Sequence, residues 1–312
     1  MQSLAIAIPV YNNSSLLREC LHSIQIQSSK EFDVHIYDDD STENYLSILK
    51  SFSDFPIIYT RNKNNLGALA NMQFAYNDLK GKYKFVMIMH EDDLLHQQFI
   101  ETVMNAISLN KSTAFAITNF TFFDNSEELT GITKTNFSIN NGFLINKKEL
   151  ALRFLQLKSL AFGSVVYNTQ VYKTMELNIE QYEEFADRPF LLNGLNNLSQ
   201  IALINEPIYF YRSHGLTDNR WKRLLPEHVF NALKLYKEIL LKSGFLTTKV
   251  FKKYAMAFVF EAYKNLLLTG RNYFFLSYLW SAKLQGFFSF KYALLKNSTI
   301  NKAGARLKKI FN

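Results

Sequence analysis

The chain has 312 residues, 48% of them hydrophobic, which is enough apolar material for the core of a large folded domain and excludes an intrinsically disordered protein. Cys20 is the only cysteine, which excludes an intramolecular disulfide and a thiolate zinc site and fits a reducing compartment such as the cytoplasm. The formal net charge is +8, but the sequence contains neither zinc-finger spacing nor an aromatic RNA-binding motif, so we expect no nucleic-acid partner.

Strand-like and helix-like segments alternate over the first 125 residues. Short apolar segments predict strands at residues 4–10, 32–37, 56–60, 83–89 and 113–123. Apolar residues at helical spacing predict helices between them, at residues 16–24, 43–52, 68–79 and 97–109. This alternation predicts an α/β fold with a mostly parallel, Rossmann-like sheet, right-handed crossovers and helices on both faces.

The second half of the chain is less regular. The elements expected there are, in chain order, a polar loop or lid at 125–141, a helix from 146 to about 157, a short strand at 164–167, a helix at 182–195, a short strand at 201–204 and an extended segment at 207–214. Asn146 and Glu149 have capping-box spacing, which favours the first of these helices. Arg212 and His214 fall on one face of the extended segment, and a pair of cationic side chains pointing one way suits an anion.

Beyond residue 225 the pattern becomes helical and basic. Residues 1–230 carry 20 basic and 25 acidic side chains, whereas residues 231–312 carry 15 and 2. The chain is expected to consist of an α/β domain at residues 1–218, whose end is set by the resemblance described below, and a basic, amphipathic, α-helical C-terminal extension at residues 219–312. The extension predicts docking on an anionic membrane surface. The alternative is that its helices pack on the α/β domain and that their lysines are ordinary solvated faces.

The expected location is the cytoplasm, including the inner face of the plasma membrane if the basic extension binds lipid. No uninterrupted apolar run reaches the roughly eighteen residues that span a bilayer. The first nine residues lack a basic segment before the apolar one, so they predict a strand and not a signal peptide.

Four polar clusters follow predicted strands directly, at residues 11–12, 38–41, 61–62 and 90–93. Open parallel sheets bind ligands at the carboxyl ends of their strands, so we expect these clusters to meet at one edge. For any one cluster the alternative is ordinary turn chemistry, because Asp, Asn and Ser are common in loops. The three consecutive carboxylates at 91–93 raise one another's pKa unless a cation compensates, which predicts a divalent metal site; the alternative is that they cap the next helix.

Five short motifs together resemble those of family 2 glycosyltransferases with the GT-A fold. They are IAIPVYN at residues 6–12, YDDDSTE at 37–43, NLG at 65–67, HEDD at 90–93 and YRSH at 211–214. Each motif is weak alone, but the five follow the family's order and cover residues 4–218. The resemblance implies that residues 1–218 are a catalytic domain that uses a nucleotide-sugar donor, with uridine diphosphate as the expected carrier.

By this resemblance the first motifs hold the donor nucleotide. The residues implied are Pro9, Tyr11, Asn12, Asp38, Asp39, Asn65, Gly67, Asn71 and Glu91, the last of them near the donor sugar. Asp40 stands where the family usually has glycine, and Asp tolerates a positive φ less well than glycine, so the turn is expected to differ here. Asn71 fits a variant of the third motif, and its alternative is a residue on the helix surface.

The resemblance also places the family's Asp-x-Asp metal motif at residues 90–93. Asp92 would bind a divalent ion, Mn²⁺ or Mg²⁺, that bridges the two phosphates of the donor. His90 replaces the first aspartate of the motif; it would contact the ribose, bind the metal through nitrogen, or order the turn without touching a ligand. Arg212 and His214 would donate to the diphosphate, and His214 is also a candidate metal ligand. Asp93 is expected to begin the following helix.

A carboxylate on the acceptor side is implied as the catalytic base. Asp187 fits best, because Pro189 and an apolar run follow it at the family's offset, and Glu184 is the second candidate. The alternative is that Asp187 only caps a helix. The implied mechanism is direct displacement with inversion, in which Asp187 removes the proton of the acceptor hydroxyl as that hydroxyl attacks the anomeric carbon.

The function implied is metal-dependent transfer of a hexosyl or N-acetylhexosaminyl unit to a glycan or lipid-linked acceptor in cell-surface polysaccharide biosynthesis. One alternative is a sugar nucleotidyltransferase, whose Gly-rich loop after the first strand is missing here. The other is a catalytically inactive scaffold of the same fold that docks on membranes. Retention of Asp39, Asp92, Asp187, Arg212 and His214 together argues against the scaffold.

Overall fold

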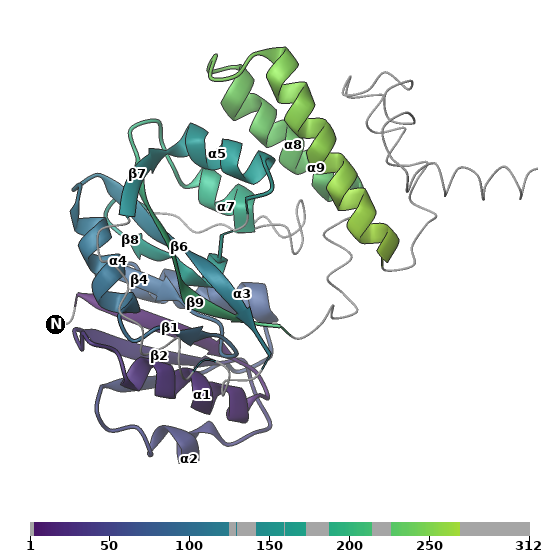
Figure 1. Cartoon of the computed structure of the whole chain (residues 1–312). Helices are drawn as coiled ribbons and strands as arrows, with labels where there is room; N and C mark the ends of the chain where they lie inside the picture. The colour runs from purple at the N-terminus through teal and green to yellow at the C-terminus, as the bar shows by residue number, and fades with distance from the viewer. Residues whose placement is uncertain are drawn as a thin grey trace, which may run out of the picture.

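The computed structural model describes residues 3–124, 129, 142–158, 160–172, 187–213 and 226–268. Glu184, His214 and the end of the chain lie outside these described residues, so the predictions made for them stay predictions. The described chain forms a nine-stranded sheet that helices cover on both faces (Figure 1).

Six strands run in one direction and form the frame of the sheet. They are β1 (Leu4–Val10), β2 (Phe32–Asp38), β3 (Ile57–Arg61), β4 (Phe85–Ile88), β6 (Thr113–Phe123) and β9 (Gln200–Arg212). Three shorter strands run against them: β5 (Leu94–Leu95), β7 (Gly142–Asn146) and β8 (Val166–Asn168). The order across the sheet is β3-β2-β1-β4-β8-β6-β9-β5, with β7 paired to β9. The prediction of a mostly parallel sheet is therefore confirmed.

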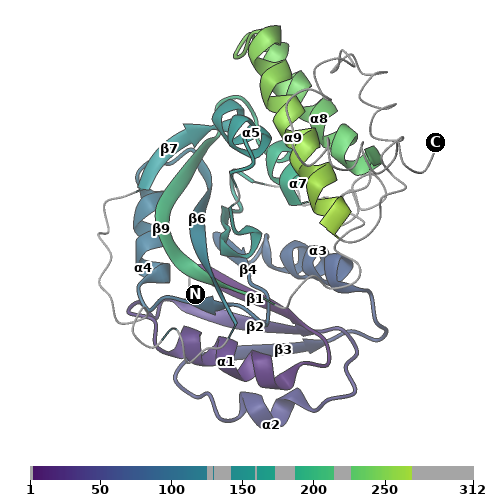
Figure 2. The same cartoon turned by 45° about the vertical axis from the view of Figure 1, so that its right-hand side comes forward.

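The helices form two layers, one on each face of the sheet, which Figure 2 shows from a second side. One layer contains α1 (Ser14–Gln25), α2 (Tyr45–Leu49) and α4 (Phe99–Ser108). The other contains α3 (Ala68–Leu79), α5 (Lys147–Leu155) and α7 (Asp187–Asn193), and α8 (Pro226–Leu241) and α9 (Thr248–Leu268) pack on the outside of α5. The α/β architecture with helices on both faces thus matches the prediction.

Strand β1 shows why the sheet is buried on both faces. Leu4, Ile6 and Ile8 point into the layer of α1, α2 and α4, while Ala5 and Ala7 point into the layer of α3, and none of the five is more than 1% exposed. A strand in the middle of a parallel sheet has no solvated face, so it must be apolar at consecutive positions. The polar residues of the chain are thereby confined to the ends of the strands.

Helices α8 and α9 belong to the same hydrophobic core as the α/β layers. Phe230 and Tyr236 of α8 and Phe258 of α9 are buried in one cluster with Phe154 of α5 and Tyr172. The described helices of the C-terminal region therefore pack on the α/β domain, as the second interpretation of that region predicts, and the division after residue 218 stays a prediction. None of the described helices is both long and apolar enough to cross a lipid bilayer.

The local helix signals are confirmed in one place and wrong in another. Asn146 accepts hydrogen bonds from the backbone of Lys148 and Glu149, and the Glu149 carboxylate accepts the Asn146 N–H at 2.9 Å, which is the predicted capping box. Helix α4 begins at Phe99, so the expectation that Asp93 begins it is wrong. Asp93 lies in the turn after β4 and bonds to β9 instead.

Candidate active site

The polar clusters that follow β1, β2 and β3 meet at one edge of the sheet. The Asp39 N–H donates to the Val10 carbonyl at 2.9 Å, and the Asn62 N–H donates to the Asp38 carbonyl at 2.8 Å. The Asn12 side chain accepts the Thr42 N–H at 2.8 Å. This convergence, predicted from the carboxyl-end rule, arises because the three strands are parallel neighbours.

The cluster after β4 joins the same edge through Glu91. Its Oε1 accepts the backbone N–H of Tyr11 at 3.2 Å, which connects the ends of β4 and β1. Tyr11 is half exposed and Pro9 lies within β1. All four clusters are therefore brought together at this edge, where Tyr11 is exposed.

Asp39 holds the NLG loop. Its Oδ1 accepts the Leu66 N–H and the Asn62 side-chain amide, each at 2.8 Å, and its Oδ2 accepts the Gly67 N–H at 2.8 Å. Asn65 adds a bond of 3.0 Å to the Asp39 carbonyl. The Asp39 side chain is 2% exposed, so its first task is to position this loop, and a contact of Asp39 with base or ribose stays a prediction.

The turn around Asp38 is equally well ordered. The buried Asp38 carboxylate accepts the Ser41 N–H at 2.9 Å and the Tyr59 hydroxyl. Asp40 adopts φ of 63°, in the left-handed region where the family's glycine would be unstrained, and its carboxylate pairs with Arg61 at 2.8 Å. The turn therefore keeps the conformation that glycine favours, so the expectation that it differs here is not met in its backbone.

Asn71 is buried, so its interpretation as a helix-surface residue is wrong. Its side-chain amide donates to the Tyr37 carbonyl at 2.9 Å, and its oxygen accepts a bond of 3.0 Å from Asn62. Asn71 therefore fixes α3 against the end of β2. Gly67, the N-cap of α3, has φ of 85°, a value that a side chain would strain.

His90, Asp92 and Asp93 form the candidate metal site. One possible ligand atom from each of them lies within 4.8 Å of the others. A nitrogen and two carboxylate oxygens are a suitable partial ligand set for Mn²⁺ or Mg²⁺, which complete their coordination with phosphate and water oxygens. Burial and the neighbouring charges of Asp92 and Glu43 raise the pKa of Glu91 to about 8.

Asp93 is the structural member of this group. It is 1% exposed, and it accepts the Tyr209 hydroxyl at 2.6 Å and the Arg212 N–H at 2.9 Å. The Nδ1 of His90 lies 3.4 Å from its Oδ2. Asp93 therefore connects the turn at residues 90–93, which we call the metal turn, to β9. This leaves Asp92 as the better-placed carboxylate for an ion.

Arg212 holds the same turn from the other side. Its Nε donates to the Asp92 carbonyl at 2.8 Å and its Nη2 donates to the Glu19 carboxylate at 2.7 Å. Its guanidinium carbon lies 4.5 Å from the ring centroid of Phe123. Arg212 thus orders the metal turn, in addition to any contact with a diphosphate.

Asp187, the predicted base, is the first residue of α7. Its Oδ1 accepts the N–H of the next residue, Arg188, at 2.7 Å. Burial lowers the pKa of His90, but Asp93, Asp92 and Asp187 raise it more, so that the net shift is upward. Asp187 is therefore close enough to the metal turn for its charge to act on His90.

Two residues at the site carry no sequence signal. Glu19 is one of several polar residues on α1, and Tyr209 is one aromatic residue in an alternating strand. Their partners, Arg212 and Asp93, are 193 and 116 positions away along the chain. Only the folded sheet brings these pairs together.

An α/β sheet with an Asp-anchored loop and a His and Asp cluster at its strand ends is the arrangement that the sequence resemblance to GT-A glycosyltransferases implies. The model of the family described as Glycosyl transferase family 2 matches residues 5–175, more than half of the chain. The chain therefore belongs to glycosyltransferase family 2.

Two similar curated proteins come from Streptococcus pneumoniae serotype 4. Glycosyltransferase GlyA is 32% identical over 219 residues, which are 67% of this chain and 30% of that protein. Glycosyltransferase GlyG is 23% identical over 222 residues, which are 67% of this chain and 70% of that protein. The chain thus spans less than a third of the first relative's length.

Solved structures with this fold include S. aureus TarS 1-349. The TM-score is 0.58 at 16% identity, and the match covers 87% of this chain and 74% of that one. TarS 1-349 in complex with UDP gives a TM-score of 0.56 at 15% identity, over 82% of this chain and 70% of that one. At these identities the likeness shows the GT-A fold alone.

Proposed function

We propose that the protein transfers a sugar from a UDP-sugar donor to a hydroxyl group of a glycan or lipid-linked acceptor, with inversion and with a divalent metal ion, in the synthesis of a bacterial surface polysaccharide. The two relatives from Streptococcus pneumoniae are named as glycosyltransferases, and a structure with the same fold is a complex with UDP. These findings support sugar transfer and the choice of donor, and the pathway class rests on the sequence resemblance.

The observation that carries the proposal is the meeting of two kinds of group at one sheet edge. The Asp39-held loop and the open ring of Tyr11 offer a nucleotide surface, and the ligand atoms of His90, Asp92 and Asp93 lie within 4.8 Å of one another beside it. A nucleoside diphosphate presents a base at one end and metal-binding phosphate oxygens at the other. The two halves of the site suit the two halves of that donor.

In the proposed reaction Asp187 is the general base. It removes the proton of the acceptor hydroxyl while the hydroxyl oxygen attacks the anomeric carbon and the bond to the diphosphate breaks. His90 and Asp92 would hold a divalent ion, which supplies charge neutralisation to the departing diphosphate. Arg212 has N–H groups beyond those bonded to Asp92 and Glu19, and we assign these and His214 to the diphosphate as well.

A donor screen tests the proposal. The full chain is incubated with Mn²⁺ and a panel of sugar nucleotides, and release of nucleoside diphosphate is measured with and without EDTA. We expect release from at least one UDP-sugar that EDTA abolishes. Release of pyrophosphate from a nucleoside triphosphate in the presence of a sugar 1-phosphate would favour the nucleotidyltransferase, and failure to bind any nucleoside diphosphate with Mn²⁺ would favour the scaffold.

The same proposal places the protein in the cytoplasm, at the inner face of the plasma membrane. The membrane location is supported by the charge of residues 231–312, which contain 15 basic and only 2 acidic side chains. Each Lys or Arg side chain near an anionic leaflet contributes about 1 kcal/mol to binding. Lipid-linked acceptors lie at that surface, so docking would bring enzyme and acceptor together.

A further inference from the structure

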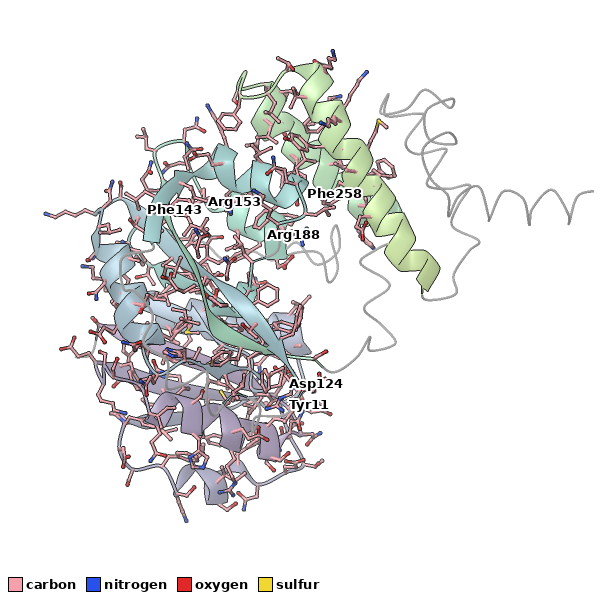
Figure 3. All side chains as sticks on the ribbon, viewed as in Figure 1. Tyr11, Asp124, Phe143, Arg153, Arg188 and Phe258 are labelled. Carbon is pink, nitrogen blue, oxygen red and sulfur yellow. The ribbon has the colours of Figure 1, made fainter. Side chains whose placement is uncertain are left out.

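A hollow of about 340 Å³ lies at the ends of β6 and β9, and Phe122, Phe123, Asp124 and Ser213 line it. Both strands run parallel to β4, so their ends reach the same edge of the sheet as the metal turn. Figure 3 shows Asp124 and Tyr11 at this end of the molecule. None of the four lining residues belongs to the proposed donor site.

Phe122 presents a rigid apolar face to solvent. Its side chain is 63% exposed, which is unusual for a large aromatic residue. Two further rings hold it in place: the centroids of Phe120 and Tyr211 lie 5.0 and 5.6 Å from its own, both nearly perpendicular. An exposed ring that is already fixed loses little conformational entropy when a ligand stacks on it.

Polar groups stand beside this ring. The side chains of Asp124 and Ser213 are exposed, and the Ser213 N–H donates to the Phe123 carbonyl at 2.8 Å, which fixes the end of β9 to the end of β6. A carboxylate accepts hydrogen bonds and a hydroxyl both donates and accepts them. A pyranose ring has C–H groups on one face and hydroxyl groups around its edge, so it matches an aromatic face flanked by these two residues.

Other occupants fit less well. A lipid chain would bury the Asp124 carboxylate without a partner, which costs free energy. A phosphate group would meet the negative charge of Asp124. The hollow is therefore suited to a neutral polyhydroxylated ring.

The hollow also has the right place along the sheet. The nucleotide residues lie at the ends of β1 and β2, the metal turn follows β4, and β6 and β9 come further along in the same direction. Phe123, at the base of the hollow, is 3% exposed and stacks on Arg212, which holds the Asp92 carbonyl. We infer that this hollow is a subsite for a sugar ring of the acceptor, stacked on Phe122 and hydrogen-bonded by Asp124 and Ser213, an inference that rests on the proposed function.

Saturation-transfer NMR with simple glycosides tests the subsite. The probes are the methyl β-glycosides of glucose, galactose and N-acetylglucosamine, added to the full chain with UDP and Mn²⁺. We expect saturation transfer to the protons of one sugar face for at least one glycoside. Phe122→Ala should reduce the signal about fivefold, and Phe122→Tyr, which keeps the ring, should retain it. Asp124→Ala should also reduce the saturation-transfer signal. Because Asp124 is exposed, this second variant does not disturb the core.

Phe143→Ala is the matched control. Phe143 is 37% exposed on β7 and lies far from Asp124 in Figure 3, so this variant should give the wild-type signal. Absence of a signal from all three glycosides, or equal signals from wild type, Phe122→Ala and Asp124→Ala, would overturn the subsite. A UDP and Mn²⁺ titration of the wild type separates the two proposals: if UDP binds and the glycoside result is negative, only the subsite fails, whereas absence of UDP binding removes the proposed function itself.

Discussion

Arg212 Nε donates to the backbone carbonyl of Asp92 at 2.8 Å, so the last strand of the sheet holds the turn that carries the candidate metal ligand. The other end of the same guanidinium bonds Glu19 of α1 at 2.7 Å. One side chain therefore connects three elements that are remote in the sequence. Because its side chain is only 8% exposed, these bonds are shielded from water and depend on the forked shape of arginine.

Arg212→Lys should loosen this turn. Lysine cannot donate to Asp92 and Glu19 at once from the same place, so we expect the free energy of unfolding to fall by about 1–3 kcal/mol. Urea denaturation measures the change. Glu19→Gln is the control. Glu19 is 36% exposed, so removal of its charge should lower the free energy of unfolding by less than about 1 kcal/mol. Equal effects of the two variants would show that the bond to Asp92 does not matter.

Asp93→Ala should destabilise the protein more than Tyr209→Phe. The first change removes a buried carboxylate and leaves the Tyr209 hydroxyl and the Arg212 N–H without their acceptor, which costs about 2–4 kcal/mol. The second removes one hydroxyl and leaves Asp93 its bond to Arg212, at about 1 kcal/mol. Thermal or urea unfolding ranks the two, and the reverse order would contradict the structural role of Asp93.

Asp187→Asn should separate catalysis from donor binding. Asparagine keeps the size of the side chain but cannot take a proton at neutral pH, so we expect transfer to fall by about 10²–10⁴-fold. The affinity for UDP and Mn²⁺, measured by calorimetry, should stay within about twofold. Glu184→Gln is the comparison, and the role of base passes to Glu184 if that variant loses transfer while Asp187→Asn retains it.

His35 should make the stability depend on pH. Burial lowers the pKa of His35 from its ordinary value of 6.5, an effect that outweighs the opposing charges of Asp33 and Asp78. Near pH 6.5 His35 therefore binds a proton in the unfolded chain but not in the folded chain. The free energy of unfolding should fall as the pH decreases below 6.5. Urea unfolding of wild type and His35→Gln at pH 7.5 and 5.5 checks this. The variant should gain stability relative to wild type at the lower pH, and a constant difference would contradict the assignment.

The basic C-terminal region should direct the protein to anionic membranes. We expect the full chain to bind liposomes containing anionic lipid at low salt, to bind neutral liposomes poorly and to be released at high salt. Removal of the residues after Lys283 should abolish the binding, as measured by co-sedimentation. Unchanged binding by the shortened chain would assign these lysines to solvated helix faces.

Much of the sheet could be predicted from the sequence. Its strands are continuous apolar runs, and they alternate with helices whose apolar residues recur at helical spacing. The predicted helix at 68–79 has the bounds of α3, and the segments at 201–204 and 207–214 belong largely to one strand, β9, whose register shifts opposite residues 118–120. Strand β5 has two residues, too few for any pattern to register. The long elements could thus be predicted, and of the short strands the one at 166–168 is also expected, whereas the one at 94–95 is not.

The candidate site could be predicted as a set of positions but not as a set of contacts. The carboxyl-end rule brings the clusters at 11–12, 38–41, 61–62 and 90–93 to one edge. The rule does not predict that the Asp39 carboxylate accepts hydrogen bonds from the NLG loop or that Asn71 is buried. Both depend on how α3 packs on β2. Neither Glu19 nor Tyr209 has a local pattern, since each is defined by its partner on another strand or turn.

Side chains at the end of β6 alternate between the two faces of the strand, so two adjacent phenylalanines have different surroundings. Phe123 points inward to Arg212, which bonds to the metal turn, whereas Phe122 points outward and packs on the rings of Phe120 and Tyr211. On the proposed assignment, a change of acceptor can occur through Phe122 and Asp124 while the donor machinery is left intact. New specificities for this scaffold should therefore be sought by varying the outward position of a strand whose inward position stays fixed.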